Sequence, residues 1–175
     1  MEIEIQTGND KSLAELMGYN GSIYFGIPRE TSERKAEKIN NGENISNADI
    51  MLIMERGSPI MNIPARPWLE PACMKHKSEI RDAFSVIFNH LAMGNKAEAD
   101  KQMEILAQRI ERWIKSYMRE DNGWAPNSPI TIHGGWMKNK VTGKPVYVKG
   151  KGSDRPLFDT GALLGAIRSI FVKGE

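Results

Sequence analysis

The sequence is poor in cysteine and histidine, and this scarcity removes whole classes of functional site. Cys73 is the only cysteine, so the fold forms without an intrachain disulfide and no cysteine pair exists to bind zinc. The three histidines, His76, His90 and His133, do not form His-x-x-x-His or His-Glu-x-x-His motifs. We therefore expect no metal site and no cofactor. Cys73 falls on the apolar side of a predicted helix, which favours a buried, inert thiol.

Long apolar runs and a strong net charge are also missing. No stretch approaches the length that spans a bilayer, so we expect no membrane partner. The 24 basic and 22 acidic residues give a net charge of +2, which is not a global signature of polyanion binding.

The N-terminus lacks the basic start and apolar centre of a signal peptide, which favours a cytoplasmic protein. The 175 residues, 40% of them hydrophobic, predict a single globular domain over residues 1–175.

Two amphipathic patterns between residues 67 and 119 predict a long helical hairpin. Each should span roughly 20 to 25 residues, or about 30 to 37 Å at about 1.5 Å per residue. Gly94 suits the left-handed end of the first helix, and Asn95 with Glu98 can cap the second. In both patterns the apolar residues recur at three- and four-residue spacing, so each forms one face. The first face comprises Leu69, Ala72, Cys73, Ile80, Ala83, Phe84, Ile87, Phe88 and Leu91, and the second Ala99, Met103, Leu106, Ala107, Ile110, Trp113, Ile114 and Tyr117.

Shorter patterns precede the hairpin. Alternation over residues 2–6 and apolar, β-branched and aromatic residues over 23–27 predict strands, with one or two helical turns at 11–18 between them. Residues 29–44 are polar and predict an exposed loop. Ser46 or Asn47 can cap a short helix that stops at Gly57, and three prolines, at 59, 64 and 67, then impose an extended path.

The chain after the hairpin changes character. Residues of about 124–153 are rich in glycine and proline and predict a long, mobile basic arm, with a strand at 144–151 and a possible partner strand at 130–136. Residues 160–170 predict a C-terminal helix capped by Asp159 or Thr160, followed by a short strand. The predicted fold class is α+β, with a small antiparallel sheet packed against the helical hairpin and the C-terminal helix.

The basic arm supplies the candidate binding residues, Lys138, Lys140, Lys144, Lys149 and Lys151. Trp124, Trp136 and Tyr147 are interleaved with them, and aromatic rings among cations suit single strands or phosphate backbones. A small nucleic-acid-binding module is therefore one hypothesis. A solvated loop that simply collects lysine and glycine is the more ordinary explanation of the same composition.

Motifs of catalysis are missing. There is no Gly-x-Ser-x-Gly elbow, and the glycine-rich runs lack the context of a phosphate loop. A hydrolase would have to use isolated acids such as Asp49, Glu55, Asp154 or Asp159, which nothing in the sequence ties together. We expect no enzyme and no catalytic residues.

Two stretches carry a family resemblance. "NADIMLIMERGSPIMNIPARPWLEPA", and "WAPNSPITI" followed by "KGSDRPLFDTGALLGAI", resemble elements of tailed-bacteriophage virion morphogenesis proteins, the head–tail connector, neck and tail-completion group. The match covers roughly residues 45–72 and 124–170, and it departs from the family pattern at Arg56 and Trp68. The matching residues are Glu55, Gly57, Ile63, Pro64, Ala65, Arg66, Pro67, Trp68, Leu69, Trp124, Pro126, Asn127, Ser128, Pro129, Pro156, Leu157, Asp159, Thr160, Gly161 and Leu163.

The resemblance implies a non-enzymatic structural protein of the phage neck or tail. Its partners would be other copies of itself, in a hexamer-like ring around the DNA channel, and neighbouring neck or tail proteins. It would be found in the virion, and in the host bacterial cytoplasm during assembly. The basic arm, residues 133–151, would line the lumen and contact DNA, or reach a neighbouring subunit.

Overall fold

A computed structural model of the chain describes residues 18–32, 46–140, 142–154 and 161–174. The chain divides into two compact units. Their boundaries fall inside helices and strands, so the division leaves the prediction of a single domain untested. The first unit comprises Met1–Phe25, Cys73–Trp113 and Ser169–Glu175, and the second comprises Gly26–Ala72 and Ile114–Arg168.

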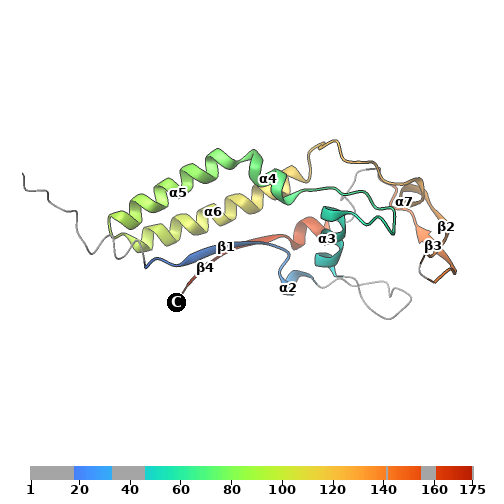
Figure 1. The fold of residues 1–175 in the computed structure, drawn as a ribbon, viewed down its shortest axis with the longest axis horizontal. Helices are drawn as coiled ribbons and strands as arrows, with labels where there is room; N and C mark the ends of the chain where they lie inside the picture. Colours follow the sequence, from blue (N-terminus) through green and yellow to red (C-terminus); the bar gives the residue numbers. More distant parts are fainter. Residues whose placement is uncertain (1–17, 33–45, 141, 155–160, 175) are drawn as a thin grey trace, which may run out of the picture. The chain divides into compact units, whose positions relative to one another are not determined.

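The fold class is α+β, as predicted. Helices dominate, and the strands form two separate two-stranded sheets, one from β1 and β4 and the other from β2 and β3 (Figure 1). The elements are β1 (Gly21–Gly26), α2 (Arg29–Ser32), α3 (Asn47–Arg56), α4 (Leu69–Lys75), α5 (Lys77–Ala92), α6 (Lys96–Tyr117), α7 (Pro129–His133), β2 (Gly134–Lys138), β3 (Pro145–Lys149), α8 (Ala162–Ala166) and β4 (Arg168–Lys173).

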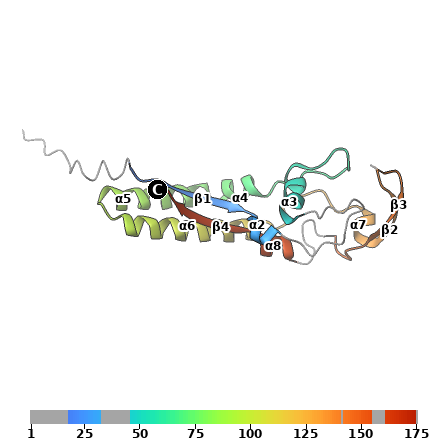
Figure 2. The ribbon, with the colours of Figure 1, turned by 90° about the horizontal axis from the view of Figure 1, so that it is seen from below.

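The predicted helical hairpin forms the body of the first unit. α5 and α6 run side by side, and β1 with β4 runs along them in both views (Figures 1 and 2). The turn between the helices depends on Gly94, whose φ of 75° confirms the predicted left-handed end. Its amide donates to the Leu91 carbonyl, and the Asn95 amide donates to the His90 carbonyl, which closes the helix end.

Side chains of α6 hold the β1–β4 ribbon. Tyr19, just before β1, donates its hydroxyl to Asp100, and Lys173 at the end of β4 pairs with the same carboxylate. Burial and the hydrogen bond to Asp100 raise the pKa of Tyr19, so the phenol stays protonated. The Ser169 amide donates to Glu111 at 2.9 Å. A two-stranded ribbon is marginal alone, so these bonds to a long helix help to stabilise it.

Most of the apolar stripe of α6 is buried as predicted, but part of the predicted α5 face is not. Six residues of the α6 stripe are at most 5% exposed: Ala99, Met103, Leu106, Ala107, Ile110 and Ile114. Trp113 and Tyr117, the other two, are half-buried. On α5, Ile87 and Leu91 are buried, whereas Phe84 is 37% and Phe88 55% exposed. These rings lie 6.5 Å apart on one helix face. Periodicity identified the apolar face correctly but overestimated how much of it is covered.

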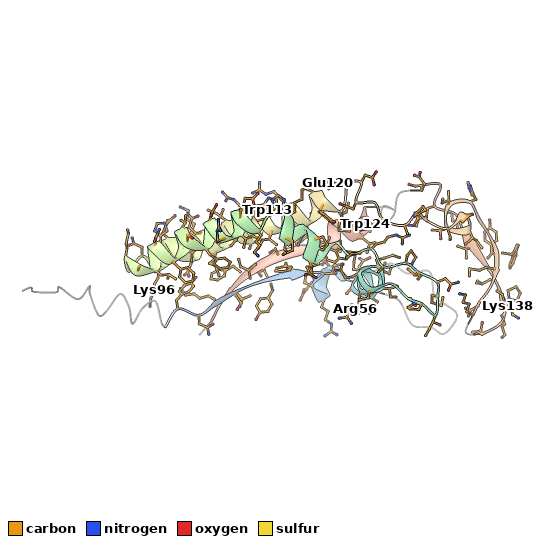
Figure 3. The ribbon with its side chains drawn as sticks, turned by 45° about the horizontal axis from the view of Figure 1, so that its top comes forward. Arg56, Lys96, Trp113, Glu120, Trp124 and Lys138 are labelled. Carbon is orange, nitrogen blue, oxygen red and sulfur yellow. The ribbon has the colours of Figure 1, made fainter. Side chains whose placement is uncertain are left out.

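The first helix of the hairpin is not continuous, which corrects the prediction. It breaks at His76, whose φ of −111° and ψ of 24° separate α4 from α5. The His76 ring stacks on Trp113 of α6 with centroids 4.4 Å apart and planes 8° apart, and its Nδ1 lies 3.0 Å from Glu79 (Trp113 is labelled in Figure 3). Stacking on Trp113 and the contact with Glu79 hold the His76 ring at this break.

Two further predictions are corrected at short elements. Residues 29–32, predicted as loop, form the single turn α2, where the Thr31 hydroxyl donates to the Ala166 carbonyl at 2.7 Å. The predicted helix at 160–170 is confined to α8, and β4 starts at Arg168, so Ile170 lies exposed on a strand. Pairing with β1 outweighs the helical periodicity there. The predicted elements at 2–6 and 11–17, and the Asp159 or Thr160 cap, lie outside the described residues.

The His76–Glu79 contact generates a prediction about pH. Hydrogen bonds from His76, from the Glu79 backbone and from Ser78 lower the pKa of Glu79 from 4.5 to about 2. Because the folded pKa is the lower one, the stabilisation is present above pH 4.5 and is lost as the pH falls through about 2. We expect Glu79→Gln to lower stability at pH 7 and to lower it much less at pH 2, as measured by urea unfolding. Glu104→Gln controls for loss of one exposed carboxylate, and an equal loss at both pH values would contradict this account.

Candidate functional site

The two stretches that carry the family resemblance meet within the second unit. We call their contact region the motif junction and define it by Glu55, Arg66, Trp124 and Asn127. Glu55 lies on α3, which begins as predicted at the Ser46 cap, where Ser46 and Asp49 form a reciprocal capping box. Hydrogen bonds from Ser46 lower the pKa of Asp49, so the capping carboxylate stays charged.

Gly57 makes the turn that leads from α3 into the proline-rich segment. Its φ is 72°, and a Cβ there would lie 2.7 Å from the Ala65 amide nitrogen and 2.8 Å from the Ile63 carbonyl oxygen. Ser58 and Ile63 exchange backbone hydrogen bonds across the loop that follows. Only glycine fits where the backbone of residue 57 approaches that of Ile63 and Ala65 so closely. After this loop the chain runs back along α3, and the Arg66 side chain is buried.

Arg66 is the centre of the motif junction. Its side chain is only 4% exposed, and Nε and Nη2 both donate to the Ala125 carbonyl, at 3.0 and 2.9 Å. Nη2 also reaches the Pro126 carbonyl at 3.2 Å and Asn127 Oδ1 at 3.5 Å. Burial lowers the pKa of the guanidinium, but an arginine stays charged in proteins. A buried cation thus ties the "IPARPW" segment to the "WAPNSP" segment.

The other three junction residues extend this network. Glu55 Oε2 accepts from the Trp68 amide at 2.9 Å and the Leu69 amide at 3.4 Å, so a side chain of α3 caps the start of α4. Trp124 Nε1 donates to the Pro67 carbonyl at 3.2 Å. Asn127 donates to the Asp154 carbonyl at 3.2 Å, which holds the chain beyond β3. Every bond links segments that are distant in sequence.

Within the predicted basic arm, β2 and β3 form an antiparallel hairpin, which confirms the strand at 144–151. The partner strand is Gly134–Lys138 only, because residues 129–133 form α7, capped by Ser128. Trp136 pairs with Tyr147, Lys138 with Pro145 and Gly134 with Lys149. Paired residues share a face, so one face carries Trp136, Lys138, Tyr147 and Lys149. We call this the outer face.

The outer face is exposed and combines aromatic and cationic groups. Trp136 is 73% and Tyr147 59% exposed, and their rings meet edge to face with centroids 5.5 Å apart. Lys138 and Lys149 flank the pair on the same face, and Figure 3 marks Lys138 on the hairpin. Such a surface offers stacking and positive charge together.

The five candidate lysines do not form one cluster. Lys138 and Lys149 lie on the outer face, whereas Lys144 lies in the turn before β3. Lys140 turns back to the loop after α3, where its Nζ donates to the Ile60 carbonyl at 3.3 Å. Lys151 lies beyond β3 and lines a cavity in the second unit. Only two of the five therefore belong to a shared surface.

The acids considered for a hydrolase do not converge either. Asp49 and Glu55 serve as helix caps, Asp154 contributes its backbone carbonyl to Asn127, and Asp159 lies outside the described residues. Cys73 is half-buried rather than fully buried, and burial raises the pKa of its thiol. In the described part of the chain, no group of three His, Cys, Asp or Glu side chains is placed to hold a metal ion. None of the described helices is long and apolar enough to cross a bilayer.

Comparisons of the chain with protein-family models, with curated proteins and with solved structures each found no match. Sequence reasoning identified the hairpin lysines but missed the burial of Arg66. The signal available in the sequence was the proline on each side of Ala65-Arg66, at positions 64 and 67, which fixes a rigid path and hence the direction of the arginine.

The base of the hairpin generates a prediction about glycine. Gly134 has a φ of 77°, and a Cβ there would lie 2.6 Å from the Gly150 amide nitrogen and 2.8 Å from the Val148 carbonyl oxygen. We expect Gly134→Ala to destabilise the second unit by about 2–4 kcal/mol, since backbone strain and overpacking add. Urea unfolding and amide exchange of the hairpin would measure this.

Gly152→Ala is the matched control, because Gly152 has a φ of 71° with nothing within 4 Å of its added Cβ. That variant should show the backbone strain alone, about 1–2 kcal/mol. Equal effects of the two substitutions would show that the close approach at Gly134 is unimportant.

Proposed function

We propose that this chain is a structural subunit of the neck or tail of a tailed bacteriophage. It would act in head–tail joining or tail completion, as a ring-forming subunit around the DNA channel. The observation that supports this most is the convergence of residues from the two resembling stretches on the motif junction. Arg66 bonds to Ala125, Pro126 and Asn127 of the second stretch, and Trp124 bonds to Pro67 of the first. Glu55 and Asn127 add bonds within their own stretches, so the residues of the family pattern form one connected network.

The proposed role is non-enzymatic. The capping roles of Asp49 and Glu55 agree with it, because both carboxylates are engaged in holding helices. The proposed partners are other copies of the chain, in a hexamer-like ring, and neighbouring neck or tail proteins. The proposed location is the virion, and the host cytoplasm during assembly.

In this role the outer face of the hairpin would contact a neighbouring subunit or the DNA in the channel. An exposed Trp–Tyr pair is the kind of aromatic surface that protein interfaces favour, and the flanking lysines add attraction to an acidic partner. The contact would leave the motif junction intact, because the outer face lies on the other side of the strands from Met137 and Val148.

We expect Lys138→Ser with Lys149→Ser to reduce ring formation, or incorporation into particles, by about tenfold while leaving the fold intact. Negative-stain imaging and mass-resolved chromatography, with and without neighbouring virion components and over a range of salt, would measure assembly. The matched control is Lys77→Ser with Lys96→Ser, two exposed lysines of the first unit. Unchanged assembly of the hairpin variant would remove the outer face from this role.

The second candidate is a small nucleic-acid-binding module, and the outer face is the observation that favours it. Stacking aromatics between two lysines would bind single strands in a salt-dependent way. In this case the free monomer binds single-stranded DNA, and replacing Lys138 and Lys149 lowers the slope of log K against log salt by about 2. Fluorescence anisotropy at several salt concentrations would measure the slope. A monomer without DNA affinity that still forms rings would exclude this candidate in favour of the first.

A further inference from the structure

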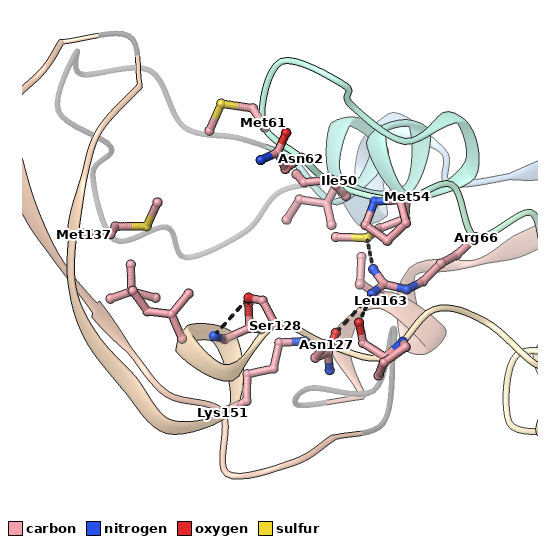
Figure 4. A pocket seen from close by; sticks show the side chains of 16 residues that line it. Ile50, Met54, Met61, Asn62, Arg66, Asn127, Ser128, Met137, Lys151 and Leu163 are labelled. Carbon is pink, nitrogen blue, oxygen red and sulfur yellow. Dashed lines mark hydrogen bonds between the residues drawn. The ribbon is translucent and has the colours of Figure 1, made fainter.

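A cavity of about 540 Å³ lies inside the second unit, bounded by α3, the segment around Arg66, α7 and the β2–β3 hairpin (Figure 4). Its volume is within the range of small-molecule sites. Most of its wall is apolar and includes three methionines, Met54, Met61 and Met137, together with Ile50 and Val148. Methionine side chains are flexible and polarizable, so they can adapt to an apolar body of variable shape.

One wall of this cavity carries a buried cation, one edge of which has only a weak hydrogen-bond acceptor. Arg66 Nε and Nη2 are satisfied by backbone carbonyls and by Asn127, but the partner of Nη1 is the thioether sulfur of Met54 at 3.6 Å. Nη1 has two N–H groups, and a thioether is a weak acceptor. Figure 4 shows the guanidinium directed at Met54 and Asn127.

The carbonyl oxygens solvate the guanidinium but do not neutralise its charge. Within the described ranges, no carboxylate lies within 4.0 Å of Arg66. Burying an ion without an opposite charge is costly, so the site favours an anion that reaches Nη1. Among the described residues that line the cavity, the charged ones are Arg66 and Lys151, and both are cations. The buried charge of Arg66 therefore favours an anionic head group on a ligand of this cavity.

The distribution of polar groups specifies the rest of the ligand. In Figure 4, Asn127, Ser128 and Lys151 lie along one side of the cavity, with Asn127 beside Arg66, while Met137 and Met61 lie across from them. Asn62 is the polar neighbour of Met61 on that far side. An extended peptide would need backbone partners along its whole length, whereas one anionic head on an apolar body matches this asymmetry. We propose that the cavity binds a small amphiphilic carboxylate, whose head accepts hydrogen bonds from Arg66 Nη1 and whose apolar body packs among the methionines. This site is independent of the function proposed above.

Decanoate is a suitable probe, with decanol and decyltrimethylammonium as uncharged and cationic analogues of equal chain length. Isothermal titration calorimetry on the full chain should show decanoate binding about tenfold more tightly than decanol, because the charge-assisted hydrogen bond is lost in the alcohol. The cationic analogue should bind more weakly still. Equal affinity for decanoate and decanol, or no binding of decanoate, would overturn the proposal.

Arg66→Gln would remove the charge but also disturbs the bonds to Ala125 and Pro126, so a second variant is needed. Met137→Trp fills the cavity while Arg66 remains, and Met137→Leu, of similar volume, is its matched control. We expect Met137→Trp to abolish decanoate binding and Met137→Leu to change it less than threefold. Decanoate binding that survives in Met137→Trp would place the ligand elsewhere and would refute the assignment.

A carboxylate of the chain itself is the competing occupant. Asp159 is the acidic residue closest along the chain to Leu163, which lines the cavity, and it lies outside the described residues. If the site accepts an external ligand, Asp159→Asn leaves the affinity for decanoate unchanged within twofold. A tenfold or greater rise in affinity would show that Asp159 already occupies the site and would overturn the proposal.

Discussion

The hydrogen bonds from the Arg66 guanidinium to the Ala125 and Pro126 carbonyls are the constraint on which the second unit depends. They join segments 59 and 60 residues apart in the sequence. Because Arg66 is fixed, the neighbouring Pro67 carbonyl can accept from Trp124, and Trp68 and Leu69 present their amides to Glu55. Loss of the arginine would release the entry to α4 and the segment before α7 together.

The two faces of the β2–β3 hairpin lie in different environments. Its strands alternate, so Met137 and Val148 face the cavity while Trp136 and Tyr147 face outward. The inner face lines the same cavity as Arg66, and the outer face exposes aromatic rings and lysines. The alternation of side chains along the strands thus separates the proposed ligand site from the proposed partner surface.

The first unit is organised around α6. The buried stripe of α6 forms the core of the helical pair, and its polar residues Asp100 and Glu111 hold the β1–β4 ribbon. The exposed rings of Phe84 and Phe88 show that α5 is less completely covered than its apolar pattern suggests. Core and ribbon therefore both depend on one helix that carries apolar residues on one face and acids on another.

Local signals in the sequence determined much of this protein. The capping box at Ser46 and Asp49, the left-handed Gly94, the stripe of α6 and the strand at β3 all follow from neighbouring residues, since caps, turns and periodicity act over a few positions. The outer-face lysines could also be named from the sequence, although not their separation from Lys140 and Lys151.

Only the tertiary structure decided the break at His76, the start of β4 at Arg168 and the burial of Arg66. Each results from a partner far along the chain: Trp113 for the histidine ring, β1 for β4, and the carbonyls of Ala125 and Pro126 for the guanidinium. At these three sites, burial and hydrogen bonding between distant segments outweigh local preference. Helical periodicity, or the usual exposure of arginine, does not indicate which distant segment will pack against a residue.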